Sequence, residues 1–345
     1  MALTLRLVIL ALVVALAPAH AAETTTVHIA MARALSAVST MAAIEKGYFR
    51  EAGIDVVVDE LDSSANALFL LAQNKVQMVE GGVSAGYFNA LEKGLPVTIV
   101  ADRATSPLGH KLIVRKDLEG TVKSIKDLKG RTIASNANGS VTSYEVAKIL
   151  KGGGLSVDDI EFKIMGFPAM AAALSNGSVD AALVIPPFSA QIPENGLGFI
   201  LADPDDYADP KPVTLSVVFA NTDWAAQHPD VMRRYMQAYL RGAREYCQAY
   251  HNGPNRAEVV DLAVRTGAEP RRDFIEKFPW QARNPLGAVN LASLEDMQKF
   301  YIAQGMATTA QPASRLFDSQ YIDAANAALG PFKLDNEKSP LPGCR

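Results

Sequence analysis

Small polar residues fill the turn between a short apolar run and a helix in the stretch RTIASNANGSVTSYEVAKIL, residues 131–150. The apolar run predicts a strand, and the amphipathic spacing after it predicts a helix from about Thr142. Free N–H groups at a helix start carry partial positive charge and favour an anion. The stretch lacks the lysine of a phosphate-binding loop, which argues against a nucleotide. It predicts one wall of a ligand-binding cleft, with a simple helix cap as the alternative; the side-chain donors would be Asn136, Asn138, Ser140, Thr142 and Ser143.

The turn GVSAG, residues 82–86, matches the pattern G-x-S-x-G of a nucleophile elbow between a strand and a helix. A serine hydrolase would also need an oxyanion turn of the HGGG type and a histidine with an acid later in the chain. That turn is missing, and His228 and His251 are poorly placed, one at a helix start and one in a loop. We therefore expect the turn to offer hydrogen-bond donors to a ligand from Gly81, Gly82 and Ser84. A secreted hydrolase that uses Ser84 stays the alternative.

Strands that alternate with helices surround both turns, which predicts right-handed β-α-β units and mostly parallel sheets. A weak internal repeat relates residues 70–82 to residues 173–185, each a helix end, a tight turn and a buried strand. The fold class is therefore α/β with two doubly wound lobes. We expect lobe one from residues 22–105, lobe two from residues 106–212, and a return to lobe one with C-terminal helices over residues 213–345.

The N-terminus has the pattern of a signal peptide, in which Arg6 precedes an apolar run and a small-x-small cleavage site near Ala21. No cysteine follows that site to accept a lipid, so we expect a free, exported periplasmic protein that is not inserted in a membrane. The whole chain carries a net charge of −4. This balance argues against nucleic acid or an anionic membrane as a partner, because both require a basic face.

The two cysteines, Cys247 and Cys344, would sit in an oxidising compartment and could form one disulfide that fastens the C-terminal tail. Two unpaired thiols are the alternative. The five histidines are far apart and never at ligand spacing with a cysteine, so we expect no metal site. We expect no cofactor either.

Four phrases, in this order and spacing, resemble the solute-binding proteins of ABC importers for nitrate, sulfonates and taurine, the NMT1/THI5-like group. They are AAIEKGYFREAGIDVVV (residues 42–58), LEKGLPVTIVA (91–101), SIKDLKGRTIA (124–134) and LSNGSVDAALVIPP (174–187). The resemblance implies the type II periplasmic binding fold, in which two lobes joined by two crossing strands close on a ligand. The crossings would lie near residues 103–111 and 211–218. It also implies a monomer that works with an ABC permease and its ATPase.

The resemblance places the ligand between strand ends and helix starts of both lobes. The matching positions in lobe one are Ser36, Ser64, Gly81, Gly82 and Ser84, and those in lobe two are Asn138, Gly139, Ser140 and Thr142, with Phe167, Pro187 and Phe188 nearby. Arg103 and His110, close to a crossing, are candidates for a charged contact. Glu80 departs from what a small inorganic anion needs, so an organic carboxylate or sulfonate is favoured over nitrate.

Two other functions remain open for this fold. A binding protein that serves a sensor kinase rather than a permease would look the same in sequence. The thiamine-pyrimidine synthase is similar in its EKGYF region, but it depends on a cysteine-rich motif that this chain does not have. We therefore expect a binding protein and not an enzyme.

Overall fold

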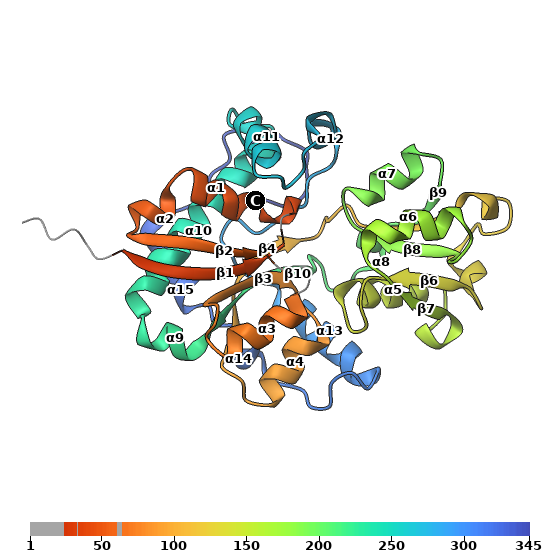
Figure 1. The fold of residues 1–345 in the computed structure, drawn as a ribbon, viewed down its shortest axis with the longest axis horizontal. Coiled ribbons are helices and arrows are strands. Elements are labelled where there is room, and N and C mark those ends of the chain that lie inside the picture. The colour runs from red at the N-terminus through yellow and green to blue at the C-terminus, as the bar shows by residue number, and fades with distance from the viewer. Residues whose placement is uncertain (1–23, 33, 61–63) are drawn as a thin grey trace, which may run out of the picture.

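The computed structural model describes residues 24–32, 34–60 and 64–345, and the expected signal peptide at residues 1–21 lies outside them. The strands form two five-stranded sheets. Each sheet is the centre of one lobe, and the two lobes lie side by side (Figure 1).

Lobe one is built on a sheet with the strand order β2-β1-β3-β10-β4. Its strands are β1 (Thr25–Met31), β2 (Ile54–Glu60), β3 (Met78–Gly82), β4 (Val97–Thr105) and β10 (Thr214–Asn221). Strand β1 runs parallel to β2 and β3, whereas β10 runs antiparallel to β3 and β4. The chain therefore leaves this sheet after β4 and returns to it between β3 and β4.

Helices cover both faces of this sheet, which is why most positions of β3, β4 and β10 are buried and apolar. On one face lie α1 (Val38–Glu45), α2 (Tyr48–Glu51), α9 (Thr222–Gln227), α10 (Pro229–Tyr250) and α15 (Gln320–Leu329), with α11 (Arg256–Arg265) and α12 (Arg272–Lys277) outside them (Figure 1). On the other face lie α3 (Ser64–Ala72), α4 (Ala85–Glu92), α13 (Leu291–Ala303) and α14 (Ala313–Leu316).

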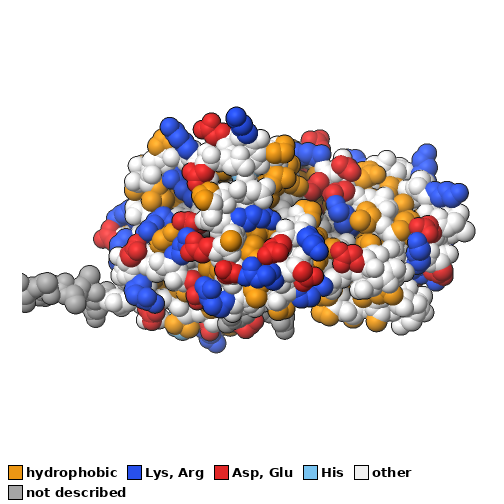
Figure 2. All heavy atoms as spheres, turned by 90° about the horizontal axis from the view of Figure 1, so that it is seen from above, with side chains coloured by type: hydrophobic (Ala, Val, Ile, Leu, Met, Phe, Trp, Pro, Cys, Tyr) orange, Lys and Arg blue, Asp and Glu red, His pale blue; other side chains and the backbone are white. Residues whose placement is uncertain are grey.

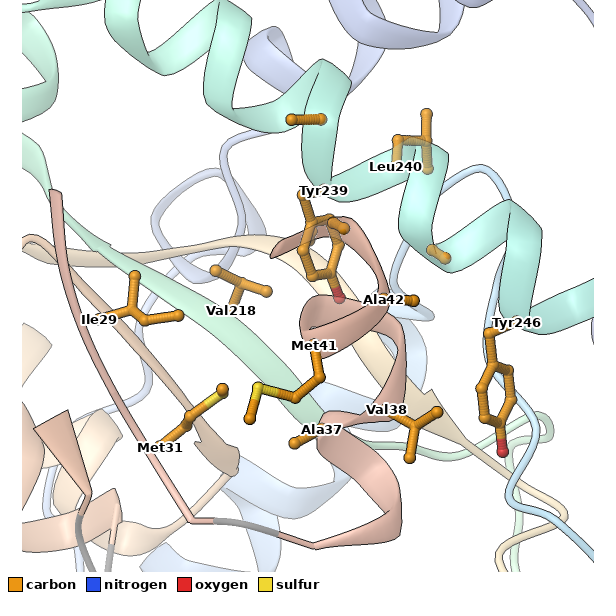
Figure 3. Close-up of a cluster of buried hydrophobic side chains, with 14 of the residues drawn as sticks. Ile29, Met31, Ala37, Val38, Met41, Ala42, Val218, Tyr239, Leu240 and Tyr246 are labelled. Carbon is orange, nitrogen blue, oxygen red and sulfur yellow. The ribbon is translucent and has the colours of Figure 1, made fainter. Parts of the chain in front are cut away.

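The long helix α10 organises the first of these faces. Pro229 occupies its first turn, where the missing N–H costs nothing. Its tyrosines at near-helical spacing, Tyr235, Tyr239 and Tyr246, are buried and pack in the core of lobe one. Figure 3 shows Tyr239 reaching from α10 toward α1, and its hydroxyl donates to the carbonyl of Asp102 at 2.7 Å.

Lobe two has a sheet with the order β7-β6-β8-β5-β9. Its strands are β5 (Lys111–Arg115), β6 (Thr132–Ser135), β7 (Glu161–Ile164), β8 (Ala181–Val184) and β9 (Gly198–Ala202). Its helices are α5 (Val141–Gly152), α6 (Phe167–Ser175), α7 (Phe188–Glu194) and α8 (Pro204–Tyr207). The alternation of strands and helices did not indicate β5 and β9, because β5 is antiparallel to β8 and β9 and no long helix precedes it.

Residues 106–110 and 208–213 carry the chain between the two lobes. A disulfide joins Cys247 of α10 to Cys344 of the tail, with 5.1 Å between their Cα atoms. The tail is fastened further because Tyr250 donates to the carbonyl of Pro342 at 2.7 Å, and His251 Nε2 lies 3.0 Å from the carbonyl oxygen of Gly343. The C-terminal residues thus belong to the core of lobe one.

The surface carries both signs of charge close together. On the face drawn in Figure 2, Lys and Arg side chains are interspersed with Asp and Glu side chains over both lobes. None of the helices in the described part of the chain is long and apolar enough to cross a bilayer.

Candidate ligand-binding site

A cavity of about 240 Å³ lies between the two lobes. Lobe one contributes residues at the ends of β1, β3, β4 and β10, and lobe two contributes the turn between β6 and α5. Most of the residues expected from the sequence line it, namely Ser36, Gly81, Gly82, Ser84, Arg103, His110, Asn138, Gly139, Ser140, Thr142 and Phe167. A cavity of this size suits a small molecule rather than a macromolecule.

The start of helix α4 forms part of the wall on the lobe-one side. Ser84 is the N-cap residue of this helix, but its hydroxyl does not cap the helix, and the buried Oγ has no hydrogen-bond partner within the part of the chain that the structure describes. Buried hydroxyls normally have a partner. Ser84 Oγ is therefore available to a ligand in the cavity.

Arg103 brings a guanidinium group from β4 to the cavity. Its Nε lies 3.0 Å from Glu80 Oε2, and its Nη1 donates to Ser216 Oγ at 3.2 Å. Glu80 also accepts a hydrogen bond from the Thr40 hydroxyl at 2.9 Å. Nη2 of Arg103 is buried and has no hydrogen-bond partner among residues 24–32, 34–60 and 64–345. Arg103 thus has its charge balanced by Glu80 and still has a donor left for a ligand.

Burial opposes both charges of this pair. It raises the pKa of Glu80 and lowers that of Arg103, while their mutual attraction acts against both shifts. Two ions taken out of water in this way remain charged only because each has the other close by. The Glu80–Arg103 pair is therefore a fixed feature of the wall rather than a pair of mobile surface charges.

A second buried arginine lies behind the first. The guanidinium of Arg283 stacks 3.5 Å from the centre of the Tyr246 ring and donates to Ser39 Oγ. Near it, Asp102 accepts a hydrogen bond from the backbone N–H of Asn284 at 2.8 Å. Burial raises the pKa of Asp102 to about 7. Two arginines and two acids thus form an ionic layer under the lobe-one wall.

The turn before α5 is held by its own hydroxyl groups. Ser140 is the N-cap of α5, accepting from the N–H of Ser143 at 3.4 Å, and it donates to the carbonyl of Ala137 at 2.8 Å. The Thr142 hydroxyl donates to Asn136 Oδ1 at 2.7 Å. The sequence predicted both hydroxyls as ligand donors, but these bonds use them within the turn. Helix capping, the simpler alternative, describes Ser140 in this structure.

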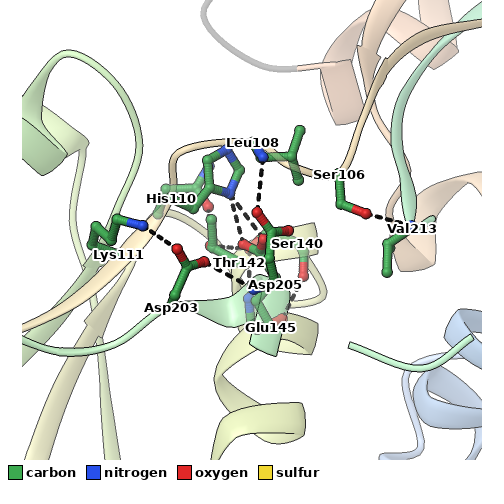
Figure 4. Close-up of polar contacts among 12 residues, drawn as sticks. Ser106, Leu108, His110, Lys111, Ser140, Thr142, Glu145, Asp203, Asp205 and Val213 are labelled. Atoms are coloured by element: carbon green, nitrogen blue, oxygen red, sulfur yellow. Dashed lines mark hydrogen bonds and ion pairs between the residues drawn. The ribbon is translucent and has the colours of Figure 1, made fainter. Parts of the chain in front are cut away.

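His110 lies where the chain enters lobe two, and its ring lines the cavity. Its Nδ1 lies 2.9 Å from both carboxylate oxygens of Glu145, a buried residue of α5 (Figure 4). Burial alone would lower the pKa of His110, but the nearby carboxylates, Glu145 first and then Asp205 and Asp203, raise it above its usual value. A histidine next to a buried carboxylate tends to keep its proton.

The two lobes touch beside the cavity. The backbone N–H of Ala85 donates to the carbonyl of Gly139 at 2.9 Å, which joins the start of α4 to the turn before α5. Farther along α5, the Tyr144 hydroxyl donates to Asp296 Oδ2 of α13 at 2.8 Å, and Lys148 Nζ lies 2.6 Å from the same oxygen. Lobe one therefore contacts both the turn before α5 and the helix itself.

Two predicted residues of the described part of the chain, Pro187 and Phe188, are not among those that line the cavity. Ser64 begins α3, and its side chain lies outside the described residues. Pro187 precedes α7, and Phe188 stacks on Phe167 with the ring centres 6.5 Å apart. Phe188 therefore packs against the ring of Phe167, which does line the cavity.

The cavity also has a lining residue that the sequence did not indicate. Gln281, in the C-terminal third of the chain, lines it, and its buried Oε1 has no hydrogen-bond partner among the residues that the structure describes. It comes close because Ala282 forms an isolated bridge with Thr105 at the end of β4. No motif surrounds Gln281, so only the folded chain reveals it.

Neither a metal centre nor an activated nucleophile is evident at this site. No group of three or more His, Cys, Asp or Glu residues could hold a metal ion within the described ranges. A serine nucleophile needs a base within hydrogen-bond reach of its hydroxyl. The Ser84 hydroxyl has no such partner in the described part of the chain, although His110 lines the same cavity.

The chain is similar to known proteins in sequence and in structure. A family model described as NMT1/THI5 like matches residues 36–252. The taurine-binding periplasmic protein of Escherichia coli (strain K12) is 26% identical over 235 residues, which cover 68% of this chain and 70% of that protein.

Two solved structures extend the likeness to most of the chain. The alkanesulfonate-binding protein SsuA from Xanthomonas axonopodis pv. citri bound to MOPS superposes with a TM-score of 0.70 at 16% identity, covering 87% of this chain and all of that one. The periplasmic nitrate-binding protein NrtA from Synechocystis PCC 6803 superposes with a TM-score of 0.71 at 14% identity, covering 93% of this chain and 92% of that one. At these identities the structures are evidence of a common fold.

Proposed function

Because this chain belongs to the NMT1/THI5-like family and has the type II periplasmic binding protein fold, we propose that it is the substrate-binding component of an ABC importer. It captures a small organic anion, a sulfonate or a carboxylate, between its two lobes. Closure of the lobes around the ligand presents one shape to the permease, whose ATPase drives transport. The proposed place of action is the periplasm.

The observation that carries this proposal is that two buried hydrogen-bond donors of the cavity residues have no acceptor in the described part of the chain. Ser84 and Arg103 both line the inter-lobe cavity, and Ser84 Oγ and Arg103 Nη2 are buried without a hydrogen-bond partner among the described residues. Leaving a buried polar group unpaired costs about 1–3 kcal/mol, and more when the group is charged. An oxyanion that accepts from both groups removes that cost, and the start of α4 adds a favourable partial charge beside Ser84.

The rest of the lining favours an organic molecule over a bare inorganic ion. Apolar side chains share the cavity with the donors, namely Val83, Leu108, Phe167, Ile185 and Leu215. An alkyl or aryl group gains about 25 cal/mol for each Å² of apolar surface that it removes from water there. The polar end of the ligand would therefore meet Ser84 and Arg103, and its carbon skeleton would meet the apolar wall.

A thermal-shift screen tests this function. The panel contains aliphatic and aromatic sulfonates, matching carboxylates, taurine and nitrate, each with the wild type and with Arg103→Met. A ligand at 100 times its Kd should add about 2.7 kcal/mol to the free energy of unfolding. We expect at least one organic anion to raise the melting temperature of the wild type but not of Arg103→Met, and an empty screen would contradict the proposal.

A second measurement separates binding from catalysis. Fluorophosphonate probes react with an activated serine, so the proposed binding protein should leave the probe unreacted. Labelling that disappears in Ser84→Ala would instead support the hydrolase alternative. Whether the ligand is delivered to a permease or reported to a sensor kinase is tested by uptake of the labelled ligand in cells that lack this protein.

A further inference from the structure

His110 and Glu145 form a buried pair whose role goes beyond holding the lobe together. His110 is one of the residues that line the cavity, and its ring Nδ1 lies 2.9 Å from both oxygens of the Glu145 carboxylate. Its Nδ1 is engaged by Glu145, but Nε2 has no hydrogen-bond partner among the described residues. An imidazole that donates Nδ1–H to a carboxylate presents a lone pair at Nε2 when neutral and an N–H when protonated. The protonation state therefore decides what His110 can offer to a ligand.

We propose that protonated His110 donates from Nε2 to the bound anion, and that Glu145 is a positioning residue that keeps the ring oriented and charged. This inference rests on the proposed capture of an anion in the same cavity. Glu145 has no place in the cavity lining, so it acts only through His110.

The charged groups around the ring favour the protonated form. Glu145 approaches from α5, and Asp205 and Asp203 approach from α8 and its N-cap (Figure 4). Lys111, next to His110 in the chain, pairs with Asp203. Arg103 lines the cavity but is paired with Glu80. The negative groups on the lobe-two side thus outnumber the free cations.

The charged groups around His110 also determine the direction in which pH should change the affinity for an anion. The carboxylates raise the pKa of His110 against the opposing effect of burial, while burial raises the pKa of Asp205 to about 6. The positive ring is present below the pKa of His110 and is lost as the pH rises through it. Affinity for an anion that stays ionised should therefore fall as the pH rises.

Titration calorimetry with ethanesulfonate and with taurine, at intervals from pH 5.5 to pH 8.5, tests the inference. Both sulfonates stay ionised in this range, so the protein alone titrates near neutrality. We expect the Kd of the wild type to rise roughly 10- to 100-fold, as the loss of a hydrogen bond to a charged group implies. In Glu145→Gln the rise should begin at lower pH, and Glu145→Asp should restore part of the wild-type profile.

A matched control removes a carboxylate from a histidine elsewhere. His28 Nδ1 lies 3.0 Å from Asp59 Oδ2 on β1 and β2, and neither residue lines the cavity. Asp59→Asn should leave the Kd profile unchanged. Imidazole resonances of the ligand-free protein should show a higher pKa for His110 in the wild type than in Glu145→Gln.

The outcomes separate this inference from the proposed function. A sulfonate that binds with the same Kd at every pH overturns the inference and leaves the proposed function standing. If neither sulfonate binds at any pH, sulfonate capture fails and the inference fails with it. If Glu145→Gln does not fold, the test rests on the wild type: the Kd should rise over the same pH range in which His110 loses its proton, and a Kd that does not follow this titration overturns the inference.

Discussion

Replacing Gly139 with alanine should weaken ligand binding by keeping the lobes apart. Gly139 lies in lobe two with φ +65°, and a Cβ atom on it would be 2.9 Å from Ala85 Cβ of lobe one and 3.3 Å from Met306 Sδ. Carbon atoms pack at about 3.5–4.0 Å. The first turn of α4 holds Ala85 in place, so the lobes must separate or lose the hydrogen bond between Ala85 and Gly139.

The substitution Gly139→Ala has two free-energy costs, and only one of them depends on closure of the lobes. The left-handed backbone of an alanine costs roughly 1–2 kcal/mol whether the lobes are open or closed. Overpacking costs about 1–3 kcal/mol, and it arises only when the lobes meet. Taking about 2 kcal/mol for the closed form, the Kd should rise roughly 30-fold, since each 1.4 kcal/mol is a factor of ten.

Gly130 provides the matched control. It also lies in lobe two with a positive φ, +72°, but a Cβ atom there would meet nothing within 4 Å. Gly130→Ala should lower the free energy of unfolding about as much as Gly139→Ala does, measured by urea denaturation, and should leave the Kd unchanged by titration calorimetry. Wild-type affinity in Gly139→Ala, or an equal loss of affinity in both variants, would refute the reasoning.

Three further predictions concern stability. Glu80→Gln leaves the buried Arg103 without its counter-ion, so urea denaturation should show a loss of about 3–5 kcal/mol; a loss below about 1 kcal/mol would mean that water reaches the pair. Replacing Cys247 and Cys344 by serine opens a link across 97 residues, which should cost about 2–5 kcal/mol without changing the Kd, and unchanged stability would contradict this. Asp102 has a folded-state pKa of about 7, raised by burial above the ordinary 3.8, so its contribution to stability is lost as the pH rises through 7. Asp102→Asn should therefore show a smaller fall in the free energy of unfolding between pH 4 and pH 7 than the wild type, and parallel curves would argue against the raised pKa.

Much of the lobe-one wall of the cavity could be predicted from the amino-acid sequence. The turn at residues 81–84 was expected to face a ligand because it follows a buried strand and begins a helix, and the structure places it in the cavity lining. Arg103 and His110 were expected near a crossing, and both line the cavity. Their partners were not expected, because Glu80 and Glu145 reach them only through the pairing of strands and the packing of α5.

The sequence could not tell which hydroxyl groups remain free. Ser84, Ser140 and Thr142 are alike in type and all lie at the start of a helix. Among the described residues, however, Ser84 Oγ has no hydrogen-bond partner, while the other two hydroxyls bond within their turn. Hydrogen bonds in a turn depend on distances of a few tenths of an ångström, which composition and spacing do not specify.

The sequence by itself determined most strands and helices of the two lobes, though not β5 and β9, because hydrophobic periodicity and turn residues act over a few positions. It did not determine the antiparallel placement of β5 and β9 or the arrival of Gln281 in the cavity. Those features depend on contacts between residues far apart in the chain, as when Ala282 bridges to Thr105. The tertiary structure alone decided which donors face the ligand, because burial and pairing are properties of the packed lobes and not of any segment.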